Sequence, residues 1–172
     1  MEVSCKIVLT GGKQEPIMAA EWNWDSGKGL LGLDDPDEWD AAWERGESCL
    51  GTAAIGLALQ CSLEEASPRI VKATQLPVPD QRGYAFTAAG TAARLNRELT
   101  PELYAALRAE GPKELAEGAI DDTLTFVPFR RLPPWFKRRW VLVTVRNRLE
   151  DLWLRAADAG GDAWQAVRGR SE

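Results

Sequence analysis

Several stretches of the chain alternate apolar and polar residues, the two-residue period of a β-strand with one buried face. Residues 3–9 follow this period until Gly11-Gly12 turns the chain, and residues 17–24 repeat it with Trp22 and Trp24 on one face. Together these two segments predict an N-terminal β-hairpin.

Later segments are interpreted as strands on the same grounds. Residues 51–61 alternate large apolar side chains with small ones, and the small face would allow another element to approach closely. Residues 69–75 are the expected partner strand, which the following prolines end, and residues 84–87 and 123–129 are shorter candidates. Both faces of residues 140–146, WVLVTVR, are apolar, which is typical of a central strand.

A helix is predicted over residues 36–45 from its start and stop signals. Asp35 can cap it, Pro36 suits its first position, and Gly46 can end it. Trp39 and Trp43 lie four residues apart and therefore share a face. Two interpretations of this pair stay open: both indoles belong to the core, or they form an exposed anchor for a protein partner.

Helices are also predicted at 101–110 and 148–159. Thr100 and Pro101 mark the start of the first, and Gly111-Pro112 its end. The second carries apolar residues at i, i+3, i+4 and i+7, beginning at Leu149 and including Trp153, and Gly160-Gly161 closes it. Residues 88–99 and the segment after Asp162 are further helix candidates.

These elements predict an α+β fold in a single domain over residues 1–172, with the last few residues frayed. We expect a largely antiparallel sheet built from the hairpin and from the strands at 51–75 and 123–146. The helices near 36–45, 101–110 and 148–159 would pack on one side of it.

The absence of histidine from the 172 residues excludes the usual general base, the Ser-His-Asp and Cys-His catalytic systems and most zinc sites. The chain has three cysteines, which we interpret as buried free thiols. With no membrane-spanning apolar run and no signal-like N-terminus, the expected location is cytoplasmic. We predict no catalytic residue, no metal and no cofactor.

Charge is unevenly distributed along the chain. Residues 1–125 carry 11 basic and 21 acidic side chains, whereas residues 126–172 carry 10 basic and 5 acidic ones. Basic and aromatic residues alternate in the RRLPPWFKRR segment, a combination that can neutralise phosphates and stack on unpaired bases. The candidate contact residues there are Arg130, Arg131, Trp135, Phe136, Lys137, Arg138 and Arg139.

The same basic segment has a second interpretation, which stays open. It can equally be a surface loop whose aromatic side chains point inward and whose arginines pair with the acidic first part of the chain. A membrane-surface helix is disfavoured, because Pro133 and Pro134 would interrupt it.

Two acidic clusters offer oxygen ligands for a divalent cation. They are the run at residues 34–38 and the pair Asp121-Asp122. Helix capping explains the first cluster and a turn explains the second, so we do not interpret either as a metal site.

The expected function is therefore a non-catalytic cytoplasmic protein-binding module, acting as an adaptor, inhibitor or assembly component through a protein partner or self-association. Eight tryptophans and the polarised charge are the positive support. The alternative is a nucleic-acid-binding protein that uses residues 129–148.

Overall fold

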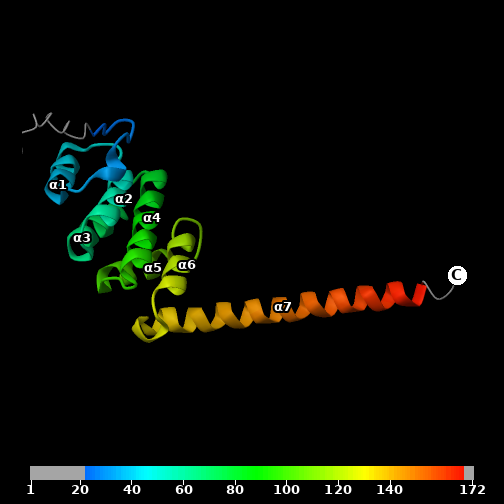
Figure 1. The fold of residues 1–172 in the computed structure, drawn as a ribbon. Coiled ribbons are helices and arrows are strands. Elements are labelled where there is room, and N and C mark those ends of the chain that lie inside the picture. The colour runs from blue at the N-terminus through cyan, green and yellow to red at the C-terminus, as the bar shows by residue number, and fades with distance from the viewer. Residues whose placement is uncertain (1–21, 169–172) are drawn as a thin grey trace, which may run out of the picture.

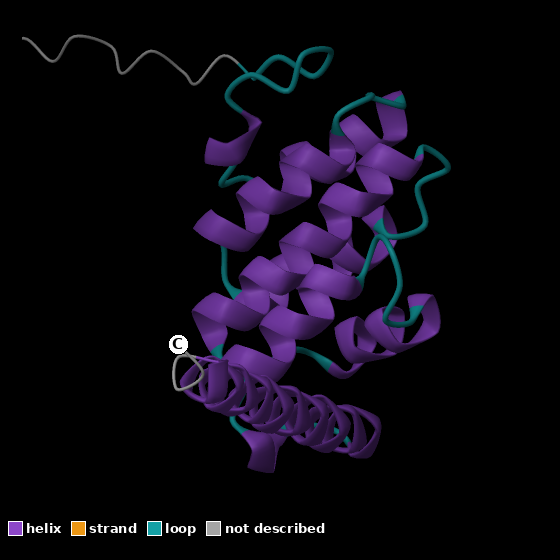
Figure 2. Ribbon diagram, turned by 90° about the vertical axis from the view of Figure 1, so that its right-hand side faces the viewer, coloured by secondary structure: helices purple, strands orange, loops and turns teal. Residues whose placement is uncertain are grey.

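The computed structural model describes residues 22–168, and every regular element in that range is a helix (Figures 1 and 2). The predicted α+β fold is wrong, because no strand occurs among these residues. The helices are η1 Leu30–Gly32, α1 Pro36–Arg45, α2 Leu50–Gln60, α3 Leu63–Ala73, α4 Pro79–Asn96, α5 Pro101–Glu110, α6 Glu117–Phe126, η2 Phe129–Arg131 and α7 Pro134–Arg168.

Two predictions fall on residues outside the described range. The first half of the expected hairpin, residues 3–9, precedes it, and the last four residues, which were expected to fray, follow it. Of the second half of the hairpin, residues 22–24 are described, and they belong to a loop.

Two helices begin and end where their capping residues predicted. The Asp35 carboxylate accepts hydrogen bonds from the backbone N–H groups of Asp37 and Glu38 at the start of α1. Gly46 ends that helix with a left-handed φ of 73°, which glycine adopts without steric cost. Thr100 caps α5 in the same way as Asp35 caps α1, through the N–H of Leu103.

The predicted strands at 51–61 and 69–75 are wrong, because these segments form the helices α2 and α3. In α2 the buried residues include Leu50, Ala53, Ala54 and Leu57, the spacing of a helix face. Apolar residues cover so much of this segment that they also satisfy a period of two. Helix α3 starts at a capping box that the strand interpretation overlooked, in which Ser62 and Glu65 bond each other's backbone.

The remaining strand predictions fail for the same reason. Residues 84–87 lie in α4, which also contains most of the helix predicted over 88–99, and residues 123–126 belong to α6. The segment WVLVTVR continues without a break into the predicted 148–159 helix, and Gly160-Gly161 does not end that helix, so that all of them form part of α7. Valine and threonine favour strands in isolation, but the positions that they occupy in the sequence also fit a helix.

Three helices, α2, α4 and α6, lie in a row with α4 in the middle, where it packs against both of the others (Figure 1). Helix α3 packs against α2, α4 and α5, while α1 packs against α2 and α3. The core along this arrangement contains the fully buried side chains of Trp39, Leu57, Ile70, Phe86 and Ile120. The bundle therefore has an apolar interior of its own before α7 begins.

Glycines allow α2 and α4 to approach neighbouring helices closely. A Cβ on Gly56 of α2 would lie 2.1 Å from the carbonyl oxygen of Leu30, and one on Gly51 would lie 2.0 Å from that of Gln81. Gly90 of α4 has a Cβ position 3.1 Å from the Cα of Ala119 in α6. The expectation that small residues permit a close approach was correct, although the approaching elements are helices.

The N-terminus of α2 is capped from another helix. Cys49 makes no side-chain capping bond there. Instead, the side-chain oxygen of Gln81 in α4 accepts hydrogen bonds from the N–H groups of Gly51 and Thr52, at 2.9 and 3.2 Å. This contact fixes the start of α2 to the first turn of α4.

Helix α7 is 35 residues long and extends far beyond the bundle (Figure 1). At 1.5 Å per residue, this length corresponds to roughly 50 Å. No helix among the described residues is both long enough and apolar enough to span a lipid bilayer.

Candidate interaction surface on helix α7

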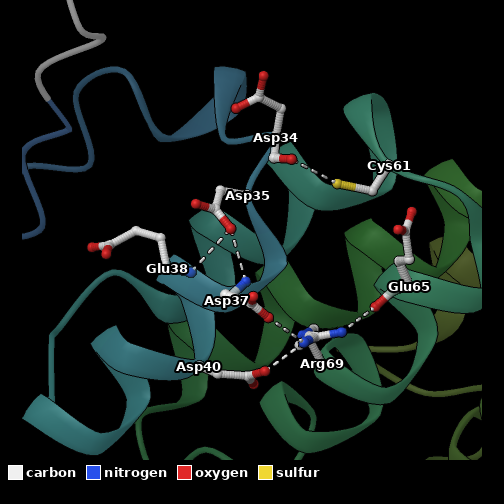
Figure 3. Close-up of polar contacts among 8 residues, drawn as sticks. All are labelled: Asp34, Asp35, Asp37, Glu38, Asp40, Cys61, Glu65 and Arg69. Atoms are coloured by element: carbon white, nitrogen blue, oxygen red, sulfur yellow. Dashed lines mark hydrogen bonds and ion pairs between the residues drawn. The ribbon is translucent and has the colours of Figure 1, made fainter.

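Acidic side chains of α1 connect this helix to α3 through Arg69 (Figure 3). The guanidinium group of Arg69 pairs with Asp40 and approaches Asp37 to 3.7 Å, while it also donates to the backbone oxygen of Glu65. Asp35 is occupied as the cap of α1. The carboxylates of this region thus hold α1 against α3, and no group of three or more metal-ligating side chains occurs among the described residues.

The tryptophan pair of α1 has two different environments. Trp39 is fully buried, and its indole N–H donates to the backbone oxygen of Leu50 at 3.1 Å. Trp43 stacks on it at a centroid distance of 5.5 Å but stays half-buried, with the Lys72 ammonium 4.4 Å from its ring centroid. Trp39 therefore serves the core, and only Trp43 reaches the surface.

An open apolar groove of about 830 Å³ lies beside Trp43, between the start of α2 and the end of α3. Cys49 lies on its wall, and burial, followed by the nearby charge of Asp25, raises the pKa of this thiol. A thiol with a raised pKa is protonated at neutral pH and is a weak nucleophile. The groove lining includes Trp43, Lys72, Leu76, Pro77 and Val78.

The basic aromatic segment is not one loop. Residues Phe129–Arg131 form η2, and Pro134 is the first residue of α7. Proline is tolerated in the first turn of a helix because its missing N–H would have no partner there. As predicted, no continuous helix runs through Pro133 and Pro134, because η2 ends before them and α7 begins at Pro134.

Two aromatic residues of the segment attach α7 to the bundle. Phe136 is almost completely buried and packs edge-on against Tyr104 of α5, with 5.1 Å between the two ring centroids. The half-buried ring of Trp135 lies against Phe136, with 4.7 Å between the two ring centroids. Burial raises the pKa of the Tyr104 hydroxyl.

The basic side chains of the segment have separate positions. Arg131 forms an ion pair with Glu98 at 3.0 Å, as expected if the arginines pair with the acidic part of the chain. Lys137 lies 5.8 Å from the ring centroid of Phe129. Arg130 and Arg138 are exposed, whereas Arg139 is half-buried.

Beyond this attachment, α7 has two distinct faces. Phe136 and Val143 lie toward the bundle, where Val143 packs against the core. On the other face the large apolar side chains are exposed: Leu142 by 67%, Val145 by 50%, Leu149 by 60% and Trp153 by 71%. We call these last four residues the α7 stripe.

The α7 stripe has charged borders and a shallow surface depression. Arg146 pairs with Glu150 one turn further along the helix at 3.0 Å. These two residues and the stripe residues Leu149 and Trp153 surround the depression. A hollow between helical side chains is the shape that receives a side chain from a facing helix.

Sequence reasoning missed all four stripe residues as surface candidates. It assigned Leu142 and Val145 to a central strand and expected the helix that carries Leu149 and Trp153 to pack on one side of a sheet. The spacing of the first two residues to Leu149 and Trp153 was the available signal, since steps of three and four residues keep side chains on one helical face.

Comparison with known proteins gives no relative for this chain: no protein family, no curated protein and no solved structure matches it.

Proposed function

We propose that this protein is a non-catalytic, cytoplasmic assembly component that binds an apolar helix of a protein partner along the α7 stripe. The observation that carries the proposal is the exposure of Leu142, Val145, Leu149 and Trp153 on one face of a helix that is fixed to the bundle at its other face. Contiguous exposed apolar side chains on a folded protein are typical of interaction sites.

The chemistry of the stripe favours a helical protein partner. Leucine and valine at steps of three and four residues form the seam that an amphipathic helix packs against. Trp153 adds a large aromatic side chain of the kind that dominates binding energy at protein interfaces. Because α7 is already helical, binding does not require the cost of folding this element.

The nucleic-acid alternative has less support. Its aromatic member Phe136 is buried and cannot stack on a base, and Arg131 is paired with Glu98. Arg130 of η2 and Arg138 of α7 are exposed, as are the rings of Phe129 and Trp140, but these two rings pack against each other with their centroids 5.1 Å apart.

Site-specific photocrosslinking in the native host tests the proposal. A photoreactive phenylalanine analogue at Leu149 should form a protein adduct whose crosslinked peptide maps to an apolar helical segment. The same analogue at Asn147, which is exposed on a different face of α7, is the matched control and should form little or none.

A second variant establishes whether the stripe is responsible for the adduct. Val145→Lys, made together with the Leu149 analogue, should remove the adduct, because an ammonium group in the seam has no partner. If the Leu149 analogue forms no protein adduct, or if the adduct is unaffected by Val145→Lys, the proposal is wrong.

A further inference from the structure

We infer that the helix bound to the α7 stripe is α7 of a second copy of this chain, running antiparallel. This inference rests on the proposed function and identifies its partner. It is carried by the distribution of charge along α7, the spacing of the stripe and the length of helix that lies free of the bundle.

Charge divides α7 into two parts. From Pro134 to Leu149 every charged residue is basic, namely Lys137, Arg138, Arg139, Arg146 and Arg148. From Glu150 to Arg168 the acidic residues Glu150, Asp151, Asp158 and Asp162 outnumber Arg155 and Arg168. A helix with a basic first half and an acidic second half is complementary to itself only when the two copies run in opposite directions.

Charge disfavours a parallel pair of α7 helices. It would place the two basic halves side by side, and like charges across a helical seam are unfavourable. The antiparallel arrangement is also symmetric about a two-fold axis, so that it closes as a dimer and leaves no free copy of the stripe.

The stripe has the spacing of a two-helix seam. Leu142, Val145 and Leu149 follow steps of three and four residues, and the sequence continues this repeat at Leu152 and Ala156. Such a repeat, with apolar residues at the first and fourth positions of each seven, is typical of paired helices.

The geometry of the bundle leaves this seam accessible. Phe136 and Val143 fix one face of α7 to the bundle, and the exposed stripe lies on another. Because α7 extends far beyond the bundle, a second helix can lie along it without displacing α7 from its contacts with α5 and the core (Figure 1).

The membrane surface is the competing ligand for a helix with basic and aromatic residues. Anionic lipid headgroups favour a helix that carries lysine and arginine along the whole length of its polar face. The acidic second half of α7 and the net charge of −5 oppose adsorption to an anionic surface. We therefore argue for the second copy and use anionic vesicles as a test.

Sedimentation equilibrium of the purified full chain is the central experiment. The wild-type protein should associate with increasing concentration to twice its mass of 19.0 kDa. Leu149→Lys should raise the dimer dissociation constant by about tenfold or more, an effect of roughly 1.4 kcal/mol or greater. Asn147→Lys is the matched control and should leave the dissociation constant within about threefold of the wild type, since Asn147 lies on a different face of α7 from the stripe.

Crosslinking determines the direction of the two helices. In a chain whose three cysteines are replaced by serine, one variant carries Arg138→Cys and another carries Ala156→Cys. An antiparallel dimer should give a short-bismaleimide crosslink mainly in the mixture of the two. Crosslinks within each variant alone would overturn the antiparallel arrangement.

The outcomes separate this inference from the proposed function. A wild-type chain that stays monomeric while the photoreactive analogue at Leu149 still traps another protein overturns the second-copy inference and leaves the proposed function standing. Loss of both signals overturns both. Binding of the monomer to phosphatidylserine vesicles, in place of dimerisation, also overturns the inference.

Discussion

The bundle and the projecting part of α7 use apolar side chains in opposite ways. Between α2 and its neighbours the residues are small, and Gly51 and Gly56 bring backbones almost into contact. Along α7 the residues are large, and Leu142, Leu149 and Trp153 remain more than half exposed. The same chain therefore completes one apolar interface internally and leaves a second one open.

The difference between these regions arises at the start of α7. Phe136 is buried against α5, and Val143 is the last of the described apolar residues of α7 that packs against the core. Beyond that point the apolar side chains of α7 whose burial is described, Val145, Leu149 and Trp153, are exposed. Helices in water gain most of their stability from packing, so this part of α7 would gain the most from a partner.

Removing the attachment of α7 should have the largest effect on stability. Phe136→Ala is expected to lower the free energy of unfolding by about 4 kcal/mol, since it leaves a cavity where a buried ring contacted Tyr104. Leu149→Ala, on the projecting part of the same helix, should change it by less than about 0.5 kcal/mol at a concentration where the chain is monomeric. Urea titration followed by circular dichroism measures both, and equal losses would contradict the contrast between the two regions.

Filling the tight seam of the bundle should have the next largest effect. Gly56→Ala places a methyl group against the Leu30 carbonyl and is expected to cost about 3 kcal/mol, because backbone atoms must move. Gly118→Ala is the matched control: its Cβ meets nothing within 4 Å, and the change should stabilise α6 by about 0.5 kcal/mol. Comparable stability of the two variants would show that the close approach is not a real constraint.

The smallest effect is expected at the start of α3. Ser62→Ala removes a helix cap and should cost about 1 kcal/mol at neutral pH. Hydrogen bonds from the Ser62 hydroxyl and N–H lower the pKa of Glu65. A carboxyl group with a lowered pKa in the folded state contributes stability above its unfolded pKa, and this contribution is lost as pH falls through the folded value.

The pH dependence of that variant is therefore a separate check. The difference between wild type and Ser62→Ala should shrink as pH falls from 7 through 4.5 and below. Thr100→Ala is the control. Thr100 caps α5 by accepting a hydrogen bond from the N–H of Leu103, and this cap has no reciprocal hydrogen bond to a carboxylate. Its cost should stay constant over the same range in urea titrations, and a parallel decline in both variants would contradict the role of Glu65.

The boundaries of α1 and α5 were predictable because their determinants are local. Asp35, Gly46 and Thr100 act within one helical turn of their own position, and proline marks both starts. Sheet and helix could not be distinguished in the same way for residues 51–61 and 140–146. Where nearly every residue is apolar or small, periods of 2 and 3.6 fit equally well, and tertiary packing determines the outcome.

The candidate surface was only partly predictable. Trp153 and Leu149 were correctly placed on a helical stripe, but their exposure depends on where the bundle ends, which no local pattern encodes. The opposite error occurred at Phe136, where a basic neighbourhood indicated a contact surface although the ring itself packs against Tyr104. Composition identified the basic aromatic segment, but only the fold shows which of its aromatic rings are buried and which are exposed.

The cap supplied by Gln81 has a consequence for the order of events during folding. The amides of Gly51 and Thr52 obtain their hydrogen-bond acceptor from a residue about 30 positions further along the chain. A chain that has formed α2 but not yet docked α4 therefore leaves these two amides exposed to solvent exchange. Their deuterium uptake would follow the undocking of α4 and not the fraying of α2, so that two neighbouring amides report the assembly of the whole bundle.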